Sequence, residues 1–271
     1  MANITDHQRR WLTGVVGLAA VLLVVGYGST PIFFLFLMSV TVQVLREYYD
    51  LSSACPGDKL VGCVLGASLL AGFYAFETTA IIGILTGIGF VLCLLSLVHF
   101  HNEETSAPVF EGQAVGIFVV ALFLAHYVEI RDLEEGKRWI FFLLSVVFAG
   151  DTCAFFGGRA WGRHKLAPRI SPGKTVEGSI LGLIGSSSAG CAFALVFLPG
   201  VPIESAFVMS VLLGFLGQLG DLWESTLKRR ARVKDSGKLL PGHGGFLDRV
   251  DSLLFTGPAL YYLIVLLTGI P

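Results

Sequence analysis

The hydrophobic and polar positions of this 271-residue chain alternate as long apolar runs and short polar segments. Several runs approach the roughly 20 residues that an α-helix needs to cross the hydrocarbon core of a bilayer. Because backbone polar groups inside a bilayer must be paired within the chain, such runs predict transmembrane helices. We place spans at residues 11–26, 31–45, 60–76, 79–98, 114–130, 139–157, 176–198, 204–223 and 251–268. The pattern therefore predicts an all-α, polytopic integral membrane bundle of about nine helices.

Composition supports this class of protein. Hydrophobic residues make up 54% of the chain and charged residues 14%, whereas about a quarter of the residues in a soluble domain are charged. The five cysteines form no C-x-x-C pair, so we interpret them as small hydrophobic residues. Glycines four residues apart indicate close helix contacts. These pairs are Gly62/Gly66, Gly83/Gly87 and Gly178/Gly182.

The distribution of Lys and Arg predicts the orientation of the chain in the membrane. With the N-terminus in the cytoplasm, all but three of the nineteen Lys and Arg residues fall in cytoplasmic segments. An even number of spans separates the polar loops 158–175 and 228–249, so both face the same compartment. The first 140 residues contain no cluster of polar residues that suggests catalysis or ligand binding. We therefore expect residues 1–140 to be a scaffold with dimer contacts, and residues 141–271 to be the catalytic region.

The first polar cluster, residues 150–178, joins the sixth and seventh spans. Asp151 lies inside an apolar run, where a carboxylate is costly and indicates function. In the segment SPGKTVEG, Lys174 offers a point charge for phosphate. Ser171 or Thr175 could cap the next helix, whose N-terminal amides favour an anion. The plainer interpretation of the arginines in this loop is a positive-inside anchor.

The second cluster lies at the end of the eighth span. Asp221, Glu224, Ser225 and Lys228 are spaced i, i+3, i+4 and i+7, so on a helix they form one polar stripe. Its two carboxylates could hold a divalent cation at the edge of the membrane. The alternative is an ion-pair network that only solubilises the end of the helix.

The third cluster, residues 228–252, reads KRRARVKDSGKLLPGHGGFLDRVDS. Its density of cations favours a polyanion, which could be a phosphate chain, a lipid phosphate or an anionic leaflet. Asp248 and Asp251 are three residues apart and can point the same way on a helix. Arg249 could reach a phosphate or pair with a carboxylate, and His243 could be a base, a ligand or an ordinary loop residue.

Carboxylates at two helix ends, with cations between them, are what metal-assisted phosphoryl or nucleotidyl transfer requires. Mg²⁺ suits such a site because it prefers hard oxygen ligands and shares its coordination with substrate phosphates. Anion binding alone would not need the aspartates.

These motifs also resemble a known family. The run S-x-x-K-R-x-x-x-x-K-D-x-G-x-x-L-P-G-H-G-G-x-x-D-R-x-D, at Ser225–Asp251, is similar to the signature of phosphatidate cytidylyltransferases. The segment S-P-G-K-T-x-E-G at 171–178 and D-T-x-A-F-x-x-G-R from Asp151 resemble the same family. Phe155 is a small departure, since Tyr is frequent at that position. The resemblance covers residues 150–252 closely.

The resemblance implies a reaction in which CTP and phosphatidate give CDP-diacylglycerol and pyrophosphate. It also implies Mg²⁺, a monovalent cation such as K⁺ as a helper, and a homodimer in the bacterial inner membrane with its site facing the cytoplasm. Membrane lipids are expected partners and nucleic acid is not.

We assign the site residues as hypotheses. The catalytic residues are Asp221, Asp248, Lys228 and Arg229. The metal ligands are Asp221, Asp248, Asp251 and Glu224, with Asp221 and Asp248 as the main anchors. The substrate-binding residues are Ser171, Lys174, Thr175, Glu177, Ser225, Lys234, Asp235, His243, Gly244, Gly245, Arg249 and Asp151.

Two other functions are open at this point. One is a CTP-dependent cytidylyltransferase that acts on another lipid phosphate. The other is an anion or lipid-phosphate transporter, which paired broken helices in two symmetric halves would support. A CDP-alcohol phosphotransferase would need a D-G-x-x-A-R element, and the chain has none.

Overall fold

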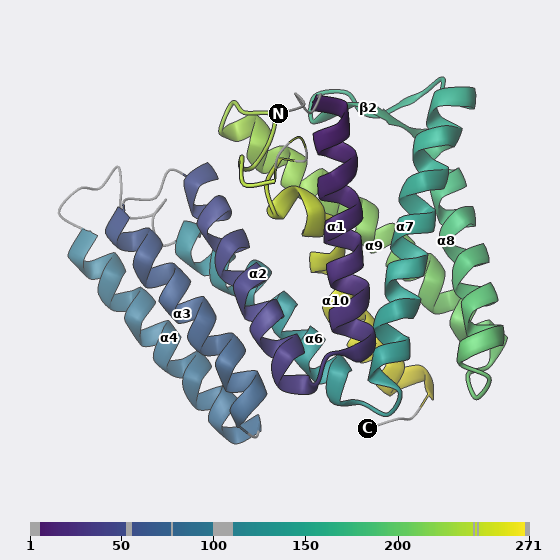
Figure 1. Ribbon diagram of the computed structural model, residues 1–271. Coiled ribbons are helices and arrows are strands. Elements are labelled where there is room, and N and C mark those ends of the chain that lie inside the picture. Colours follow the sequence, from purple (N-terminus) through teal and green to yellow (C-terminus); the bar gives the residue numbers. More distant parts are fainter. Residues whose placement is uncertain are drawn as a thin grey trace, which may run out of the picture. The chain divides into compact units, whose positions relative to one another are not determined.

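The computed structural model describes residues 6–52, 56–76, 78–99, 111–240, 242 and 244–268. His243, one of the predicted site residues, lies outside them. The described regular structure is helical apart from one two-stranded hairpin (Figure 1). The chain forms two compact units. The first unit comprises Met1–Glu129 and Arg230–Arg249, and the second comprises Ile130–Arg229 and Val250–Pro271.

The first unit is built around its N-terminal helices, and α2, α3 and η1 pack closely on one another. Their bounds are α1 Asp6–Tyr27, α2 Thr30–Leu51, α3 Pro56–Ala75, α4 Thr78–His99 and η1 Gly116–Ala121, which continues as α6 Leu122–Asp132. The Tyr49 ring lies against Gly62 and Gly116, where a Cβ would be 2.4 Å and 2.5 Å from its hydroxyl oxygen. The predicted contact at Gly62/Gly66 is therefore confirmed. Gly83 and Gly87 face open space, so that part of the prediction is wrong.

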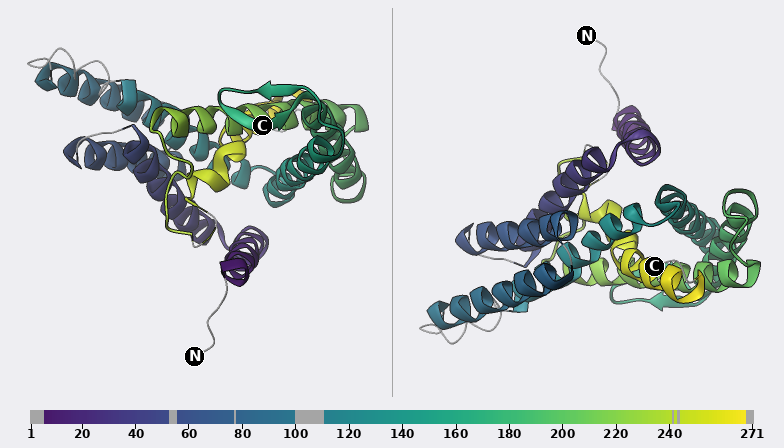
Figure 2. Two further views of the ribbon diagram at one scale, coloured as in Figure 1. Left: turned by 90° about the horizontal axis from the view of Figure 1, so that it is seen from above. Right: turned by 90° about the horizontal axis from the view of Figure 1, so that it is seen from below.

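The second unit contains a tightly packed pair of helices, α7 (Gly136–Trp161) and α8 (Val176–Phe197), which lie side by side in both views (Figures 1 and 2). A Cβ on Gly178 would lie 2.7 Å from the Ala154 carbonyl oxygen, and one on Gly182 would lie 3.1 Å from the Gly150 carbonyl oxygen. Small residues thus allow the backbones of the two helices to come into direct contact. The strands β1 (Lys165–Ala167) and β2 (Ser171–Thr175) connect them, and α9 (Ile203–Arg230) and α10 (Leu247–Thr268) follow.

Seven of the described helices are long and apolar enough to cross a membrane. They are Thr30–Leu51, Pro56–Ala75, Glu111–Asp132, Gly136–Trp161, Val176–Phe197, Ile203–Arg230 and Leu247–Thr268. α1 and α4 contain shorter apolar stretches, Thr13–Tyr27 and Ile81–Leu95. All nine predicted spans therefore fall on helices. The prediction of a polytopic helical membrane protein is confirmed.

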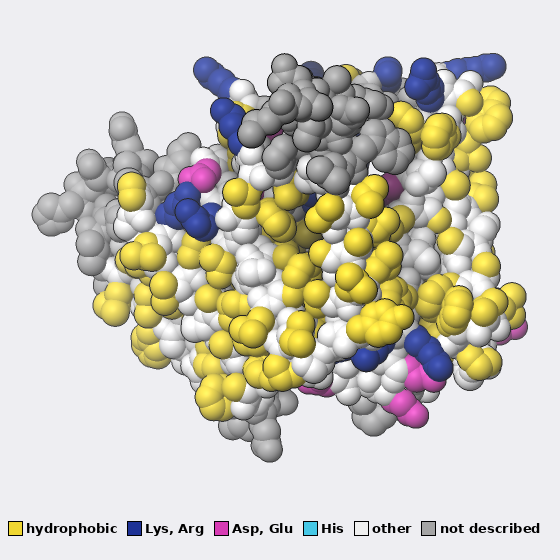
Figure 3. Space-filling view, in the orientation of Figure 1, with side chains coloured by type: hydrophobic (Ala, Val, Ile, Leu, Met, Phe, Trp, Pro, Cys, Tyr) yellow, Lys and Arg dark blue, Asp and Glu magenta, His cyan; other side chains and the backbone are white. Residues whose placement is uncertain are grey.

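The surfaces of these helices suit a lipid environment. Phe90, Leu195 and Val196 expose 69%, 69% and 68% of their areas, which in water would be unfavourable for side chains of this kind. Figure 3 shows hydrophobic side chains spread over the visible helical faces. Most of the visible Lys and Arg side chains lie along the top of this view. Backbone groups paired within helices and apolar side chains turned outward are what a bilayer requires.

Candidate active site

Three carboxylates from two helices of the second unit lie close together. Asp221 and Glu224 belong to α9, and Asp251 belongs to the first turns of α10. One oxygen from each lies within 4.8 Å of the other two. The spacing of three residues places Asp221 and Glu224 on one face of α9. A donor set of carboxylate oxygens suits a hard divalent cation, so this cluster could hold a metal ion.

The approach of α10 to α9 depends on Gly220. A Cβ on this residue would lie 2.3 Å from the carbonyl oxygen of Asp251. No side chain fits at that distance, so the two backbones can meet here only because residue 220 is glycine. This contact lies one residue before Asp221 and places Asp251 beside it.

The predicted polar stripe is present on α9. The hydroxyl of Ser225 donates to Oδ1 of Asp221 at 3.3 Å, and the ammonium of Lys228 pairs with Glu224. Glu224 is fully buried, and a buried carboxylate is costly unless a cation and hydrogen bonds compensate it. The ion-pair and metal-site interpretations of this stripe therefore involve the same side chains. Lys228 offsets part of the negative charge that would attract a metal ion.

A second cation reaches the cluster from β2. Nζ of Lys174 lies 2.7 Å from Oδ2 of Asp221, and the two side chains expose 23% and 36% of their areas. The structure thus brings together two residues that the sequence predicted for one site. Both side chains are therefore partly accessible from outside the protein.

The hairpin that carries Lys174 is held by Glu177. Its carboxylate accepts the backbone N–H of Arg163 at 3.0 Å, and it accepts both the N–H of His164 at 3.2 Å and the ring Nδ1 of that residue at 2.6 Å. Thr175 caps α8, because its Oγ1 accepts the N–H of Gly178 at 3.1 Å. Glu177 and Thr175, which the sequence assigned to substrate, are both engaged here in shaping the hairpin.

Two further contacts complete the hairpin. Ser171, the other candidate cap, begins β2 and pairs with Ala167 in an antiparallel register. Arg229 donates from Nε to the carbonyl oxygen of Ile170 at 3.0 Å. The end of α9 is therefore tied to the turn that precedes Lys174. Arg229 uses one donor for this purpose, and its side chain is otherwise exposed.

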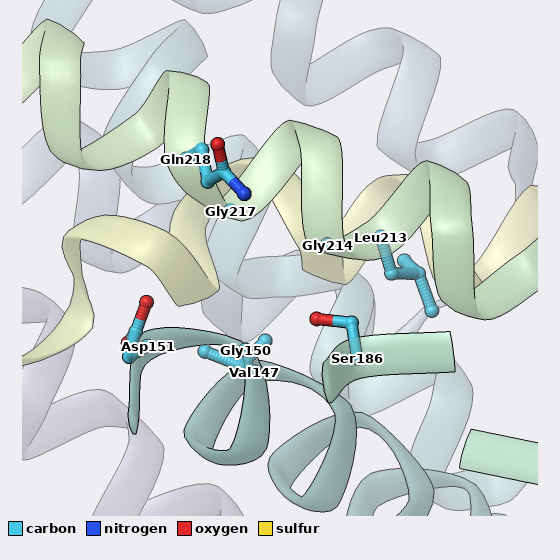
Figure 4. A pocket seen from close by; sticks show the side chains of 8 residues that line it. All are labelled: Val147, Gly150, Asp151, Ser186, Leu213, Gly214, Gly217 and Gln218. Atoms are coloured by element: carbon cyan, nitrogen blue, oxygen red, sulfur yellow. The ribbon is translucent and has the colours of Figure 1, made fainter. Parts of the chain in front are cut away.

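Asp151 lines a small pocket within the second unit (Figure 4). The pocket contains about 200 Å³ of empty space, part of it open to solvent. Its lining residues are Val147, Gly150, Asp151, Ser186, Leu213, Gly214, Gly217 and Gln218. Gln218 donates to the Ser179 carbonyl oxygen at 3.1 Å, so a polar contact joins α8 and α9 beside this pocket.

Asp248 lies in the first unit, where it organises the glycine-rich loop, defined here as residues 234–249. Its Oδ2 accepts the N–H and the hydroxyl of Ser236, both at 2.9 Å, and the N–H of Gly245 at 2.8 Å. Gly244 has φ +80°, and a Cβ there would lie 2.5 Å from Oδ2 of Asp248. Both the backbone conformation and the available space therefore require glycine at 244. The assignment of Asp248 as a metal ligand stays a prediction.

The same loop reveals a residue that the sequence analysis missed. Glu47 of α2 is 3% exposed, and its Oε2 accepts the N–H of Leu247 at 2.9 Å and the hydroxyl of Ser236 at 3.1 Å. In the sequence, Glu47 ends an apolar run and is typical of a charge at the end of a span. The remaining loop predictions, Lys234, Asp235 and Arg249, are exposed.

Together these features define a polytopic membrane protein with a cluster of three carboxylates, two of which pair with lysines. Residues 8–267 match the family model described as "Cytidylyltransferase family". The chain therefore belongs to the cytidylyltransferase family, as its motifs predicted.

Full-length relatives agree with this assignment. The chain is 37% identical to a phosphatidate cytidylyltransferase of Bacillus subtilis (strain 168), over 97% of this chain and 99% of the relative. It is 35% identical to a phosphatidate cytidylyltransferase of Brucella suis biovar 1, over 95% and 93% of the two chains. A phosphatidate cytidylyltransferase of Staphylococcus saprophyticus is 45% identical over 49% of this chain and 51% of the relative.

Proposed function

We propose that this protein is a membrane-bound nucleotidyltransferase that converts CTP and phosphatidate into CDP-diacylglycerol and pyrophosphate. Two relatives that match this chain over almost their whole length are named phosphatidate cytidylyltransferases. The observation that carries the proposal is the approach of Asp221, Glu224 and Asp251, with Lys174 at 2.7 Å from Asp221. Carboxylates and cations at one place are what a polyphosphate substrate and its metal ion require.

We assign the divalent site to Asp221, Glu224 and Asp251, with Mg²⁺ as the ion because of their hard oxygen donors. When bound, such an ion neutralises charge on the phosphate oxygens of the nucleotide. Asp248 is retained as a proposed ligand. A monovalent cation such as K⁺ is retained as a proposed helper.

Lys174, Lys228 and Arg229 are proposed to hold the triphosphate. Both lysines pair with carboxylates of the cluster. When the substrate binds, a phosphate oxygen would replace the carboxylate beside each lysine, and a metal ion would replace the lysine beside each carboxylate. A phosphate oxygen of phosphatidate then attacks the α-phosphorus of CTP. The bond from that phosphorus to the β-phosphate oxygen breaks, and pyrophosphate leaves next to the lysines. No covalent enzyme intermediate is needed, because the lipid already carries the nucleophile.

The other predicted contacts remain part of the proposal. Asp151, Ser171, Thr175, Glu177 and Ser225 would shape the site from the second unit. Lys234, Asp235, His243, Gly244, Gly245 and Arg249 would contact substrate from the glycine-rich loop. We further propose a homodimer in the bacterial inner membrane, with residues 1–140 as scaffold, residues 141–271 as the catalytic region, and the site facing the cytoplasm.

The test is turnover by the purified protein with labelled CTP and phosphatidate in mixed micelles, with CDP-diacylglycerol and pyrophosphate measured in parallel. Asp221→Asn should abolish both products while leaving the protein folded. Glu204→Gln, an exposed change at the start of the same helix, should leave turnover unchanged. Pyrophosphate release that does not need phosphatidate, or full activity of Asp221→Asn, would contradict the proposal.

A further inference from the structure

Glu47 is a buried carboxylate that accepts hydrogen bonds from three residues. Its Oε1 accepts Nε2 of Gln43 at 3.1 Å, and its Oε2 accepts the hydroxyl of Ser236 and the N–H of Leu247. Burial of a carboxylate is costly unless strong hydrogen bonds replace water. The donors from Ser236 and Leu247 come from the two ends of the glycine-rich loop. One side chain on α2 therefore holds this loop near both of its ends.

The loop approaches Glu47 so closely that two positions admit only glycine. A Cβ on Gly237 would lie 2.7 Å from Oε1, and one on Gly245 would lie 2.2 Å from Oε2. The loop backbone thus follows the surface of this carboxylate. Gly245, which the sequence assigned to substrate binding, is therefore also required by its contact with Glu47.

Ser236 links Glu47 to Asp248. Its hydroxyl oxygen lies 3.1 Å from Oε2 of Glu47 and 2.9 Å from Oδ2 of Asp248. A hydroxyl has a single proton and donates to one of these carboxylates at a time. The orientation of Asp248 is therefore coupled to the position of Glu47 through one side chain.

Apart from the hydrogen bonds that Asp248 accepts from Ser236 and Gly245, few described contacts fix the conformation of the loop. The regular pairing consists of an isolated bridge between Leu240 and Gly244, with a hydrogen bond of 3.1 Å. A segment with so few backbone pairs depends on side-chain acceptors for its order. Loss of Glu47 should therefore loosen the loop while the helices persist.

We propose that Glu47 is a positioning residue, which holds the glycine-rich loop in the conformation that binds CTP. It acts through Ser236, Leu247 and Asp248 and does not touch the substrate. This inference rests on the proposed function, because it assigns nucleotide binding to the loop. It gives the N-terminal region a part in the reaction beyond that of a scaffold.

The test variant is Glu47→Gln, which conserves the size of the side chain. Its amide has only one acceptor oxygen, so it cannot accept from Gln43 on one side and from the loop on the other unless neighbours rearrange. Even after rearrangement the hydrogen bonds are no longer charge-assisted, and we expect a loss of roughly tenfold in binding, which corresponds to about 1.4 kcal/mol. Asp50→Asn, on the same helix, is the matched control for loss of a carboxylate from α2, since its side chain is 63% accessible and pairs with Lys59 of α3.

Two readouts separate positioning from a general structural role. Hydrogen exchange followed by mass spectrometry should rise in peptides from Ser236 to Leu247 and stay unchanged in α2 and α3. The KM for CTP should rise about tenfold, with the KM for phosphatidate and kcat within about twofold of wild type. An unchanged KM for CTP, unchanged exchange in the loop, or increased exchange throughout the first unit would each overturn the inference. If the wild-type protein does not turn over CTP, the proposed function fails, and loop exchange alone decides whether Glu47 holds the loop.

Discussion

Nζ of Lys174 and Oδ2 of Asp221 lie 2.7 Å apart, so a lysine at the end of a hairpin neutralises a carboxylate within α9. Lys174 is the last residue but one of β2, and Asp221 follows the apolar part of α9. The ion pair has a consequence for ligand binding. A cation and a phosphate can enter together by replacing one ion pair with two.

Lys174→Met should therefore have opposite effects on the two ligands. The KM for CTP should rise about tenfold, because one charge-assisted contact to phosphate is lost. The Mg²⁺ concentration for half-maximal activity should fall, because Asp221 is no longer neutralised by the lysine. Steady-state kinetics with each ligand varied in turn measures both constants. Lys165→Met, on the exposed strand of the same hairpin, is the control, and parallel weakening of both ligands would argue against this electrostatic coupling.

Glu224→Gln should reduce both stability and activity. Glu224 is fully buried and Lys228 is 14% exposed, so the variant leaves a largely buried ammonium without its carboxylate. Such a loss costs about 3 kcal/mol and should lower the melting temperature of the detergent-solubilised protein.

The double variant Glu224→Gln/Lys228→Met should recover part of this stability, because no charge is left uncompensated. It should be no more active than Glu224→Gln, since it lacks both a proposed metal ligand and a proposed phosphate ligand. Thermal unfolding and turnover are measured on the same preparations. A double variant less stable than Glu224→Gln would show that the ion pair is not the main contribution.

Glu177→Gln should loosen the hairpin. The carboxylate of Glu177 holds the N–H groups of Arg163 and His164 at 3.0 Å and 3.2 Å and contacts the His164 ring. Limited trypsin digestion should therefore cut faster at Arg163, Lys165 and Arg169. Glu134→Gln, an exposed change elsewhere in the second unit, should digest like wild type. An unchanged digestion pattern would mean that the strand pairing alone holds the hairpin.

Gly220→Ala should abolish activity by separating α9 from α10. The new methyl group would lie 2.3 Å from the carbonyl oxygen of Asp251, so Asp251 must move away from Asp221. Mn²⁺ binding, followed by electron paramagnetic resonance, should weaken at least about tenfold because one carboxylate leaves the set. Gly83→Ala, a helical glycine with open space around it, provides the control, and wild-type Mn²⁺ affinity in Gly220→Ala would rule out this role for the glycine.

Much of the local organisation could be predicted from the sequence. The apolar runs predicted where helices lie, because the length and hydropathy of a membrane helix are local properties. The stripe from Asp221 to Lys228 could be predicted in the same way, since helical periodicity alone sets which residues share a face.

Contacts between distant segments were harder to predict. The sequence paired Asp221 with Asp248 as the main anchors, and this pairing stays a prediction. Within the second unit the structure brings Asp251 and Glu224 to Asp221, and within the first unit Asp248 accepts the N–H groups of Ser236 and Gly245. Helical periodicity could not separate these alternatives, because Asp248 and Asp251 differ by less than one turn. Glu47 was missed because a glutamate at the end of an apolar run is ordinary, and its donors lie almost two hundred residues away in the chain.

By itself, the sequence determined the membrane class, the positions of the helices, the acidic stripe and the family, because these depend on composition, periodicity and uninterrupted motifs. The tertiary structure decided which carboxylates meet, that Glu177 holds the hairpin, and that Glu47 holds the glycine-rich loop. Those relationships depend on close contacts of the backbone. Gly220 lies against the carbonyl oxygen of Asp251, and Gly245 lies against the carboxylate of Glu47. Such contacts are set by the packing of whole helices and loops, which neighbouring residues in the chain do not specify.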